Sequence, residues 1–254
     1  MDPTLVLLGV GAFLAGMVDA VVGGGGLIQI PLLFSAFPQA APATLFGTNK
    51  LASVFGTAGA AVQYSRRVSI PWSAAGPAAL AAAIGSWLGA WAVVLFPPAA
   101  LRPLILVLLV LVALYTFLRK DFGIHHRRLA SAGRECGLAI LIGAALGFYD
   151  GFFGPGTGSF FVFLFVRVLG YDFLHASAGA KLLNTATNVA ALALFASTGH
   201  VWWATAAVMA VANVIGSLLG ARLALRRGAG FVRGVFIVVV GALIVRTGWD
   251  ALRL

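Results

Sequence analysis

Apolar residues form long stretches that recur along nearly the whole chain. Clear examples are residues 5–22, 72–96, 101–118 and 202–225. A helix that spans a bilayer needs roughly 20 predominantly apolar residues, and each of these stretches is close to that length. A single hydrophobic anchor does not account for so many stretches. The pattern therefore predicts an all-α polytopic integral membrane protein.

The first half of the chain divides into five apolar segments, at about residues 4–22, 27–37, 43–64, 72–96 and 99–118. The second segment is too short to cross the membrane alone. At about 1.5 Å per residue it covers only about half of a hydrocarbon core roughly 30 Å thick. Because a glycine run precedes this segment, we interpret it as a half-helix in a broken or re-entrant element.

The two halves of the sequence repeat each other at one fixed offset. A shift of 131 residues aligns, without a gap, Gly16 with Gly147, Asp19 with Asp150, Gly23 with Gly154, Gly25 with Gly156, Lys50 with Lys181, and Trp72 with Trp203. Aspartate, lysine and tryptophan are scarce in this chain, so chance does not explain their coincidence. The repeat predicts a tandem duplication with a first transmembrane repeat at 1–118, a basic cytoplasmic linker at 119–136, and a second transmembrane repeat at 137–254.

The basic residues indicate how the two repeats are oriented. If the first two segments both cross or fold back as a hairpin, each half has an odd number of crossings and the halves are inverted. Nearly all loop arginines then face the cytoplasm, leaving Arg102, Arg246 and Arg253 outside. If those segments formed a single crossing, the cluster at Arg226 and Arg227 would lie outside, against the positive-inside rule. We therefore expect two inverted repeats with both termini outside.

Composition excludes several other classes of protein. With 61% apolar and 9% charged residues, the chain has more apolar surface than a soluble core of this size hides. The net charge of +10 comes from short basic clusters between apolar stretches, which determine topology, so no nucleic-acid partner is expected. Cys136 is the only cysteine and the histidines form no metal-binding pattern, so no disulfide, metal or cofactor is expected. The N-terminus lacks a basic n-region, and the first stretch should persist in the mature protein.

Each half contains an aspartate followed by a glycine-rich break. Glycine runs let the backbone unwind and turn N–H groups toward a ligand, while the next half-helix presents its positive N-terminal end. An anion is the natural ligand, although small residues also permit close helix packing. The candidate residues are Asp19 with Gly23, Gly24, Gly25 and Gly26, and Asp150 with Gly154, Gly156, Thr157 and Gly158.

Lys50 and Lys181 lie near the start of the third segment of their halves. An ionised lysine inside a membrane costs at least about 2.5 kcal/mol, so it needs a partner or a water-filled cavity. In one interpretation the lysines pair with Asp150 and Asp19 and are structural. In the other, the lysines attract a small anion while a carboxylate takes up a proton and couples transport to the proton gradient. The two interpretations are compatible.

Polar neighbours of the lysines extend the candidate site. Lys181, Asn184 and Asn188 have i, i+3 and i+7 spacing, so they project from one stripe of a helix. Interhelical hydrogen bonding is the alternative role for such residues. The substrate-binding residues expected in these segments are Thr48, Asn49, Lys50, Lys181, Asn184 and Asn188, with Ser53 and Thr187 as further polar neighbours.

At these motifs the sequence resembles the sulfite exporter TauE/SafE family of membrane transporters, over nearly the whole chain. The motifs are AGMVDAVVGGGGLIQIP from Ala15, GTNKLAS from Gly47, LGFYDGFFGPGTGSF from Leu146, and AKLLNTATN from Ala180. The resemblance implies secondary transport of small anions, often sulfur oxyanions or organosulfonates, in a bacterial cell membrane. The halves differ where Gly24 meets Pro155 and Ser53 meets Asn184, so substrate contacts are expected to be asymmetric.

The function we expect is secondary transport of a small anion by alternating access, with protons as a second partner. The alternative is a cation permease or channel in which Asp19 and Asp150 bind the permeant ion. The sequence has no GxxxxGK[ST] nucleotide loop and no HExxH motif, so we expect neither an ATP-driven pump nor an intramembrane protease. Residue types do not fix the anion, the direction of transport or the oligomeric state.

Overall fold

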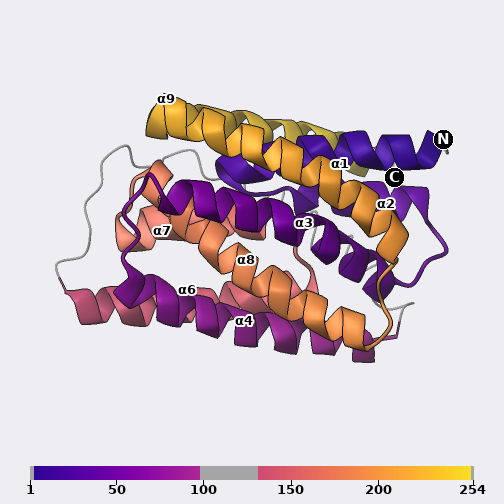
Figure 1. The fold of residues 1–254 in the computed structure, drawn as a ribbon, viewed down its shortest axis with the longest axis horizontal. Helices are drawn as coiled ribbons and strands as arrows, with labels where there is room; N and C mark the ends of the chain where they lie inside the picture. The colour runs from indigo at the N-terminus through magenta and orange to yellow at the C-terminus, as the bar shows by residue number, and fades with distance from the viewer. Residues whose placement is uncertain (1–2, 98–130, 253–254) are drawn as a thin grey trace.

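The computed structural model of the protein describes residues 3–97 and 131–252, and the described residues contain helices and no strand (Figure 1). The helices are α1 (Pro3–Val22), α2 (Gly26–Ala36), α3 (Pro42–Ser65), α4 (Trp72–Leu95), α6 (Ala132–Phe152), α7 (Thr157–Leu169), α8 (Phe173–Ser197) and α9 (Trp203–Leu252). This architecture confirms the predicted all-α polytopic fold.

Hydropathy located the helices of the first half closely, because α1 to α4 begin and end near the bounds of the first four apolar segments. The fifth segment, 99–118, and residues 119–130 of the expected linker lie outside the described residues. Residues 132–136, also expected in the linker, form the start of α6. Among the described residues, α1, α4, α6 and the Trp203–Gly228 part of α9 are long and apolar enough to cross a membrane.

Two short helices follow the glycine-rich breaks, as expected for half-helices. After α1, the chain turns at Gly23 and Gly24, which have positive φ angles of 78° and 97°. Only glycine adopts such angles without strain, and the turn leads into α2, which has 11 residues. The second break has positive φ angles at Gly154 and Gly156 and leads into α7, which has 13 residues.

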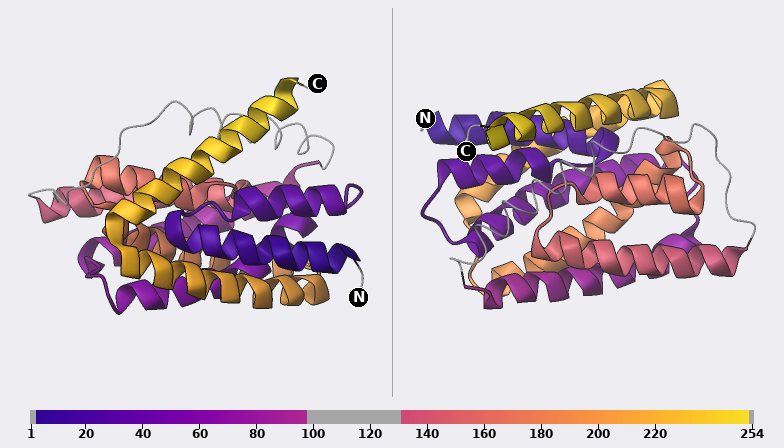
Figure 2. Two further views of the ribbon diagram at one scale, coloured as in Figure 1. Left: turned by 90° about the horizontal axis from the view of Figure 1, so that it is seen from above. Right: turned by 180° about the vertical axis from the view of Figure 1, so that it is seen from behind.

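The C-terminal helix is kinked. Inside α9, Gly228 has non-helical angles, with φ 74° and ψ −172°. Figure 2 (left) shows that the last, yellow part of α9 leaves at an angle to the orange part. In the sequence, the part beyond the kink corresponds to the fifth apolar segment of the second half at the 131-residue offset.

Glycine allows two pairs of helices to pack with their backbones in contact. α4 packs most extensively against α6, and α1 against α9. A Cβ atom on Gly151 of α6 would lie 1.9 Å from the Ser86 carbonyl oxygen, and one on Gly216 of α9 would lie 2.0 Å from that of Phe13. Membrane helices use small residues in this way to approach closely.

The helices assemble into two bundles that each combine both halves of the sequence. The first bundle consists of α1, α2, α3 and α9, and the second bundle of α4, α6, α7 and α8. Equivalent serines hold the bundles together internally. The Ser86 hydroxyl donates to the Thr187 carbonyl at 2.8 Å, and the Ser217 hydroxyl donates to the Gly56 carbonyl at 2.6 Å. The two bonds are equivalent in the repeat, because Ser86 aligns with Ser217 and Gly56 aligns with Thr187 at the 131-residue offset.

The main contact between the two bundles is made by α3 and α8, which are also equivalent at that offset. Gly47 near the start of α3 lies against Phe195 near the end of α8. Further along α3, Thr57 contacts Asn188, which lies earlier in α8. The two equivalent helices therefore run antiparallel where they cross.

Candidate functional site

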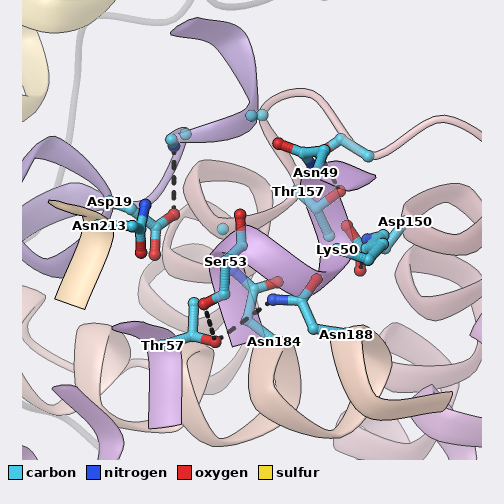
Figure 3. A pocket seen from close by; sticks show the side chains of 16 residues that line it. Asp19, Asn49, Lys50, Ser53, Thr57, Asp150, Thr157, Asn184, Asn188 and Asn213 are labelled. Atoms are coloured by element: carbon cyan, nitrogen blue, oxygen red, sulfur yellow. Dashed lines mark hydrogen bonds and ion pairs between the residues drawn. The ribbon is translucent and has the colours of Figure 1, made fainter. Parts of the chain in front are cut away.

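A polar cavity lies between the two bundles, where the glycine-rich breaks face α3 and α8 (Figure 3). Its volume is about 30 Å³. Among the described residues, no aliphatic or aromatic side chain lines it. The lining residues are Asp19, Gly24, Gly25, Gly26, Asn49, Lys50, Ser53, Thr57, Asp150, Gly154, Gly156, Thr157, Gly158, Asn184, Asn188 and Asn213.

The two glycine-rich breaks touch each other beside the cavity. A Cβ atom on Gly23 would lie 2.2 Å from the carbonyl carbon of Gly158, and one on Gly158 would lie 2.8 Å from the Cα atom of Gly23. The Ser159 hydroxyl donates to the Val22 carbonyl at 3.3 Å across the same contact. This packing brings the N-terminal ends of α2 and α7 to one place, where their helix dipoles add positive potential.

The charged residues of the two halves form crossed ion pairs. Lys50 Nζ lies 2.6 Å from Asp150 Oδ2, and we name these residues the cavity pair because both line the cavity. Lys181 Nζ lies 2.9 Å from Asp19 Oδ2, and we name these residues the buried pair because the Lys181 side chain is 0% exposed. Each pair joins a lysine of one half to the aspartate of the other. Both pairs also bridge the two bundles.

Pairing explains how four charged groups are tolerated in the interior of the protein. A buried ion is stable only when its partner and further hydrogen bonds offset the loss of hydration. Each lysine has a carboxylate within hydrogen-bonding distance, so the four formal charges sum to zero. The geometry therefore agrees with the structural interpretation of the lysines, and Lys50 of the cavity pair also lines the cavity.

Two asparagines place polar atoms without protein partners beside the cavity. Asn49 of α3 is 4% exposed and Asn184 of α8 is 6% exposed. No described residue forms a hydrogen bond with the Oδ1 atom of either side chain. Such an atom costs about 1–3 kcal/mol when it stays unsatisfied, so a ligand or water is the expected partner.

Most of the residues expected to bind substrate line this cavity. The exceptions are Gly23, Thr48 and Lys181. Gly23 packs against Gly158 in the contact between the breaks. The Thr48 hydroxyl donates to the Thr44 carbonyl and accepts from the Trp202 N–H, which fastens α3 to the start of α9. Lys181 reaches Asp19 without lining the cavity.

The cavity also contains residues that the sequence analysis did not select. Thr57 accepts a hydrogen bond from the Asn188 amide at 3.3 Å. With Lys50 and Ser53, Thr57 has the same i, i+3, i+7 spacing as the selected stripe of the second half, and this repeat signal would have found it. Asn213 of α9 aligns with Ala82, so the repeat gives no signal for it.

Comparison with known proteins gives a consistent result over the length of the chain. The family described as "Sulfite exporter TauE/SafE" matches residues 8–247. The chain is 38% identical to "Probable membrane transporter protein ORF9" of a Sinorhizobium species, over 95% of this chain and 91% of the relative. It is 35% identical to "Probable membrane transporter protein YfcA" of Escherichia coli K12, over 94% of this chain and 88% of the relative. No solved structure matches it.

Proposed function

The chain belongs to the sulfite exporter TauE/SafE family and is a membrane transporter, and from this premise we propose that it moves a small anion by alternating access. A sulfur oxyanion or a small organosulfonate is the proposed substrate class. The observation that carries the proposal is the cavity between the bundles. Its described lining combines two helix N-termini, the ion pair of Lys50 with Asp150, the carboxylate of Asp19 and neutral polar groups, with no aliphatic or aromatic side chain. Such a lining suits a compact, strongly hydrated anion.

The proposed binding site consists of residues from both bundles. Lys50 supplies the positive charge, Asn49 and Asn184 supply amide groups, and the two glycine-rich breaks supply backbone N–H groups. Thr57, Asn188 and Asn213 complete the polar surface around these groups.

Alternating access fits the size and position of the cavity. A volume of about 30 Å³ holds only a few water molecules. A compact anion that occupies the cavity would have to replace these water molecules, and we propose that it enters when the bundles separate on one side of the membrane. The antiparallel packing of the equivalent helices α3 and α8 supports an inverted repeat, which provides two equivalent conformations open to opposite faces.

The cavity pair also supports coupling to protons. Asp150 and an anion compete for the single positive charge of Lys50, so Lys50 attracts an anion more strongly when Asp150 is not ionised. Protonation of a carboxylate in the site would release a lysine for the anion and carry a proton with it. Proton-coupled transport therefore needs no group beyond those in the cavity.

We place the protein in a bacterial inner membrane with both termini outside, following the distribution of arginines. A reporter enzyme that is active only in the cytoplasm, fused after Leu254, is expected to be inactive, and a reporter active only outside is expected to be active. The same two reporters fused within the 119–130 region are expected to give the opposite result. A cytoplasmic signal from the C-terminal fusion would contradict this topology, and cytoplasmic signals from both fusions would contradict the inverted repeats.

Binding of anions is the direct test of the proposed substrate class. Sulfite, thiosulfate, sulfate, taurine and small carboxylates are added to the purified protein, and its thermal unfolding is followed. A ligand that binds the native state raises its stability by about 2.7 kcal/mol at a concentration of 100 times Kd. We expect a selective, saturable increase in Tm with a sulfur oxyanion or sulfonate. An increase with cations and with no anion would favour the cation permease.

A further inference from the structure

The two crossed ion pairs differ in how the aspartate is held. Asp19 has both carboxylate oxygens bound, since Oδ2 accepts from Lys181 at 2.9 Å and Oδ1 accepts from the Gly25 N–H at 3.2 Å. Asp150 accepts from Lys50 at 2.6 Å through Oδ2, and no described residue donates to its Oδ1. One oxygen of Asp150 is thus left without a protein donor beside the cavity.

A single sequence difference between the repeats explains this asymmetry. In the first break, positive φ angles at Gly23 and Gly24 are followed by Gly25 with φ −53°, and its N–H turns back to Asp19. In the second break Pro155 occupies the position of Gly24 and cannot adopt a positive φ. The second positive φ moves to Gly156, at 81°, and no bond to the aspartate forms from there.

Other hydrogen bonds hold the second break in place. The Tyr149 hydroxyl donates to the Pro155 carbonyl at 2.7 Å, and the Thr157 hydroxyl donates to the Gly154 carbonyl at 2.8 Å. These bonds hold the loop without using the carboxylate of Asp150. Protonation of Asp150 therefore removes no support from the loop, whereas protonation of Asp19 would weaken the bond to Gly25.

Access to the cavity separates the two lysines, whereas both aspartates line it. Lys50 and Asp150 both line the cavity and lie together in it, as Figure 3 shows. In the buried pair only Asp19 lines the cavity, and Lys181 is 0% exposed. When Lys50 loses its bond to Asp150, an anion in the cavity can take the place of the carboxylate, so the Lys50 ammonium always has a negative partner. A released Lys181 has no such exchange, and its unpaired charge would be costly.

From these differences we propose that Asp150 is the proton-accepting group of the transporter and Lys50 its anion-binding cation, while the buried pair is a fixed link between the bundles. The proposal rests on the function proposed above. One proton from solution adds to the Asp150 carboxylate, its ion pair with Lys50 breaks, and the Lys50 ammonium binds an oxygen of the anion. On release of the anion the proton leaves and the cavity pair re-forms. A monoanion is then carried with one proton, with no net charge moved.

The surroundings of Asp150 support its assignment as the titrating group. The charged side chains that line the cavity with it are Lys50 from α3 and Asp19 from α1, and Asp19 is already bound to Lys181. The lining residues from α7, α8 and α9 are uncharged, and α4 contributes none. The neighbouring Tyr149 donates its hydroxyl proton to a backbone carbonyl.

The pH dependence of anion affinity in Asp150→Asn tests this assignment. The probe is an anion that does not titrate in this pH range, such as sulfate or thiosulfate, chosen as the one with the largest thermal shift, so that the ligand itself takes up no proton. In the unmodified protein we expect affinity to fall by about tenfold per pH unit above the titration point, as linkage to one proton requires. Asp150→Asn, which mimics the protonated carboxyl, is expected to bind tightly without that slope. The matched control Asp19→Asn/Lys181→Met neutralises the buried pair and is expected to keep the slope.

The outcomes separate this inference from the proposed function. If the unmodified protein binds no anion, the proposed function fails. If it binds an anion and Asp150→Asn keeps the slope, or the control loses it, the assignment of Asp150 is wrong. If Asp150→Asn does not fold, calorimetry of the control in buffers of different ionisation enthalpy decides: uptake of one proton per anion supports Asp150, and no uptake refutes it.

Discussion

Neutralising the cavity pair in the variant Lys50→Met/Asp150→Asn is expected to weaken anion binding by on the order of 100-fold, because a charge-assisted hydrogen bond contributes about 1.5–3 kcal/mol. The double substitution is essential to the design. Removing one member of a buried ion pair leaves an uncompensated charge and costs about 3–5 kcal/mol of stability, which would confuse loss of binding with loss of fold. The double variant removes both charges and should remain folded.

Affinity is measured by titrating the probe anion against thermal unfolding or by calorimetry. The control is Arg66→Gln, which removes a positive charge at the exposed end of the same helix, α3. This control is expected to bind the anion with unchanged affinity, because charges at an exposed surface are screened. If the folded Lys50→Met/Asp150→Asn protein binds the anion with wild-type affinity, Lys50 is not part of the binding site.

Gly151→Ala is expected to destabilise the protein by at least about 3 kcal/mol, at the upper end of the usual cost of overpacking. The added Cβ atom would lie 1.9 Å from the carbonyl oxygen of Ser86 and 2.6 Å from its carbonyl carbon. These are backbone atoms of α4, so no side-chain rotation relieves the clash. α4 and α6 would have to separate along their contact, which also disturbs the bond from Ser86 to α8.

Thermal unfolding in detergent measures this effect, with Gly137→Ala as the matched control. Gly137 lies on the same helix and a Cβ atom there meets nothing within 4 Å. The control is expected to be neutral or to gain about 0.5–1 kcal/mol, because alanine favours a helix over glycine. Equal Tm values for the two variants would mean that α4 and α6 are not in backbone contact.

The helices and most of the cavity could be predicted because the sequence is strongly patterned. Long apolar stretches give the bounds of α1 to α4. The second stretch is too short to cross the membrane alone, which predicted the half-helix α2. Charged residues are rare in the apolar segments, so Asp19, Lys50, Asp150 and Lys181 were visible as candidates. Their repetition at one offset also suggested that they act together.

The partners of each helix could not be predicted, because hydropathy shows which segments enter the membrane and not which ones touch. For example, α1 packs against α9 of the other half, a contact that the division into repeats does not reveal. The repeat also suggested that Lys50 and Lys181 are equivalent. Only the geometry shows that Lys181 does not line the cavity, and only geometry brings Asn213 into it.

Flux through the purified protein in liposomes measures anion transport by alternating access itself. Vesicles are loaded with the anion that gives the largest thermal shift, and exchange with external labelled anion is measured at several pH values. We expect saturable, pH-dependent exchange that is lost in Lys50→Met/Asp150→Asn and retained in Arg66→Gln. A non-saturating, cation-selective conductance, with no anion exchange, would contradict it.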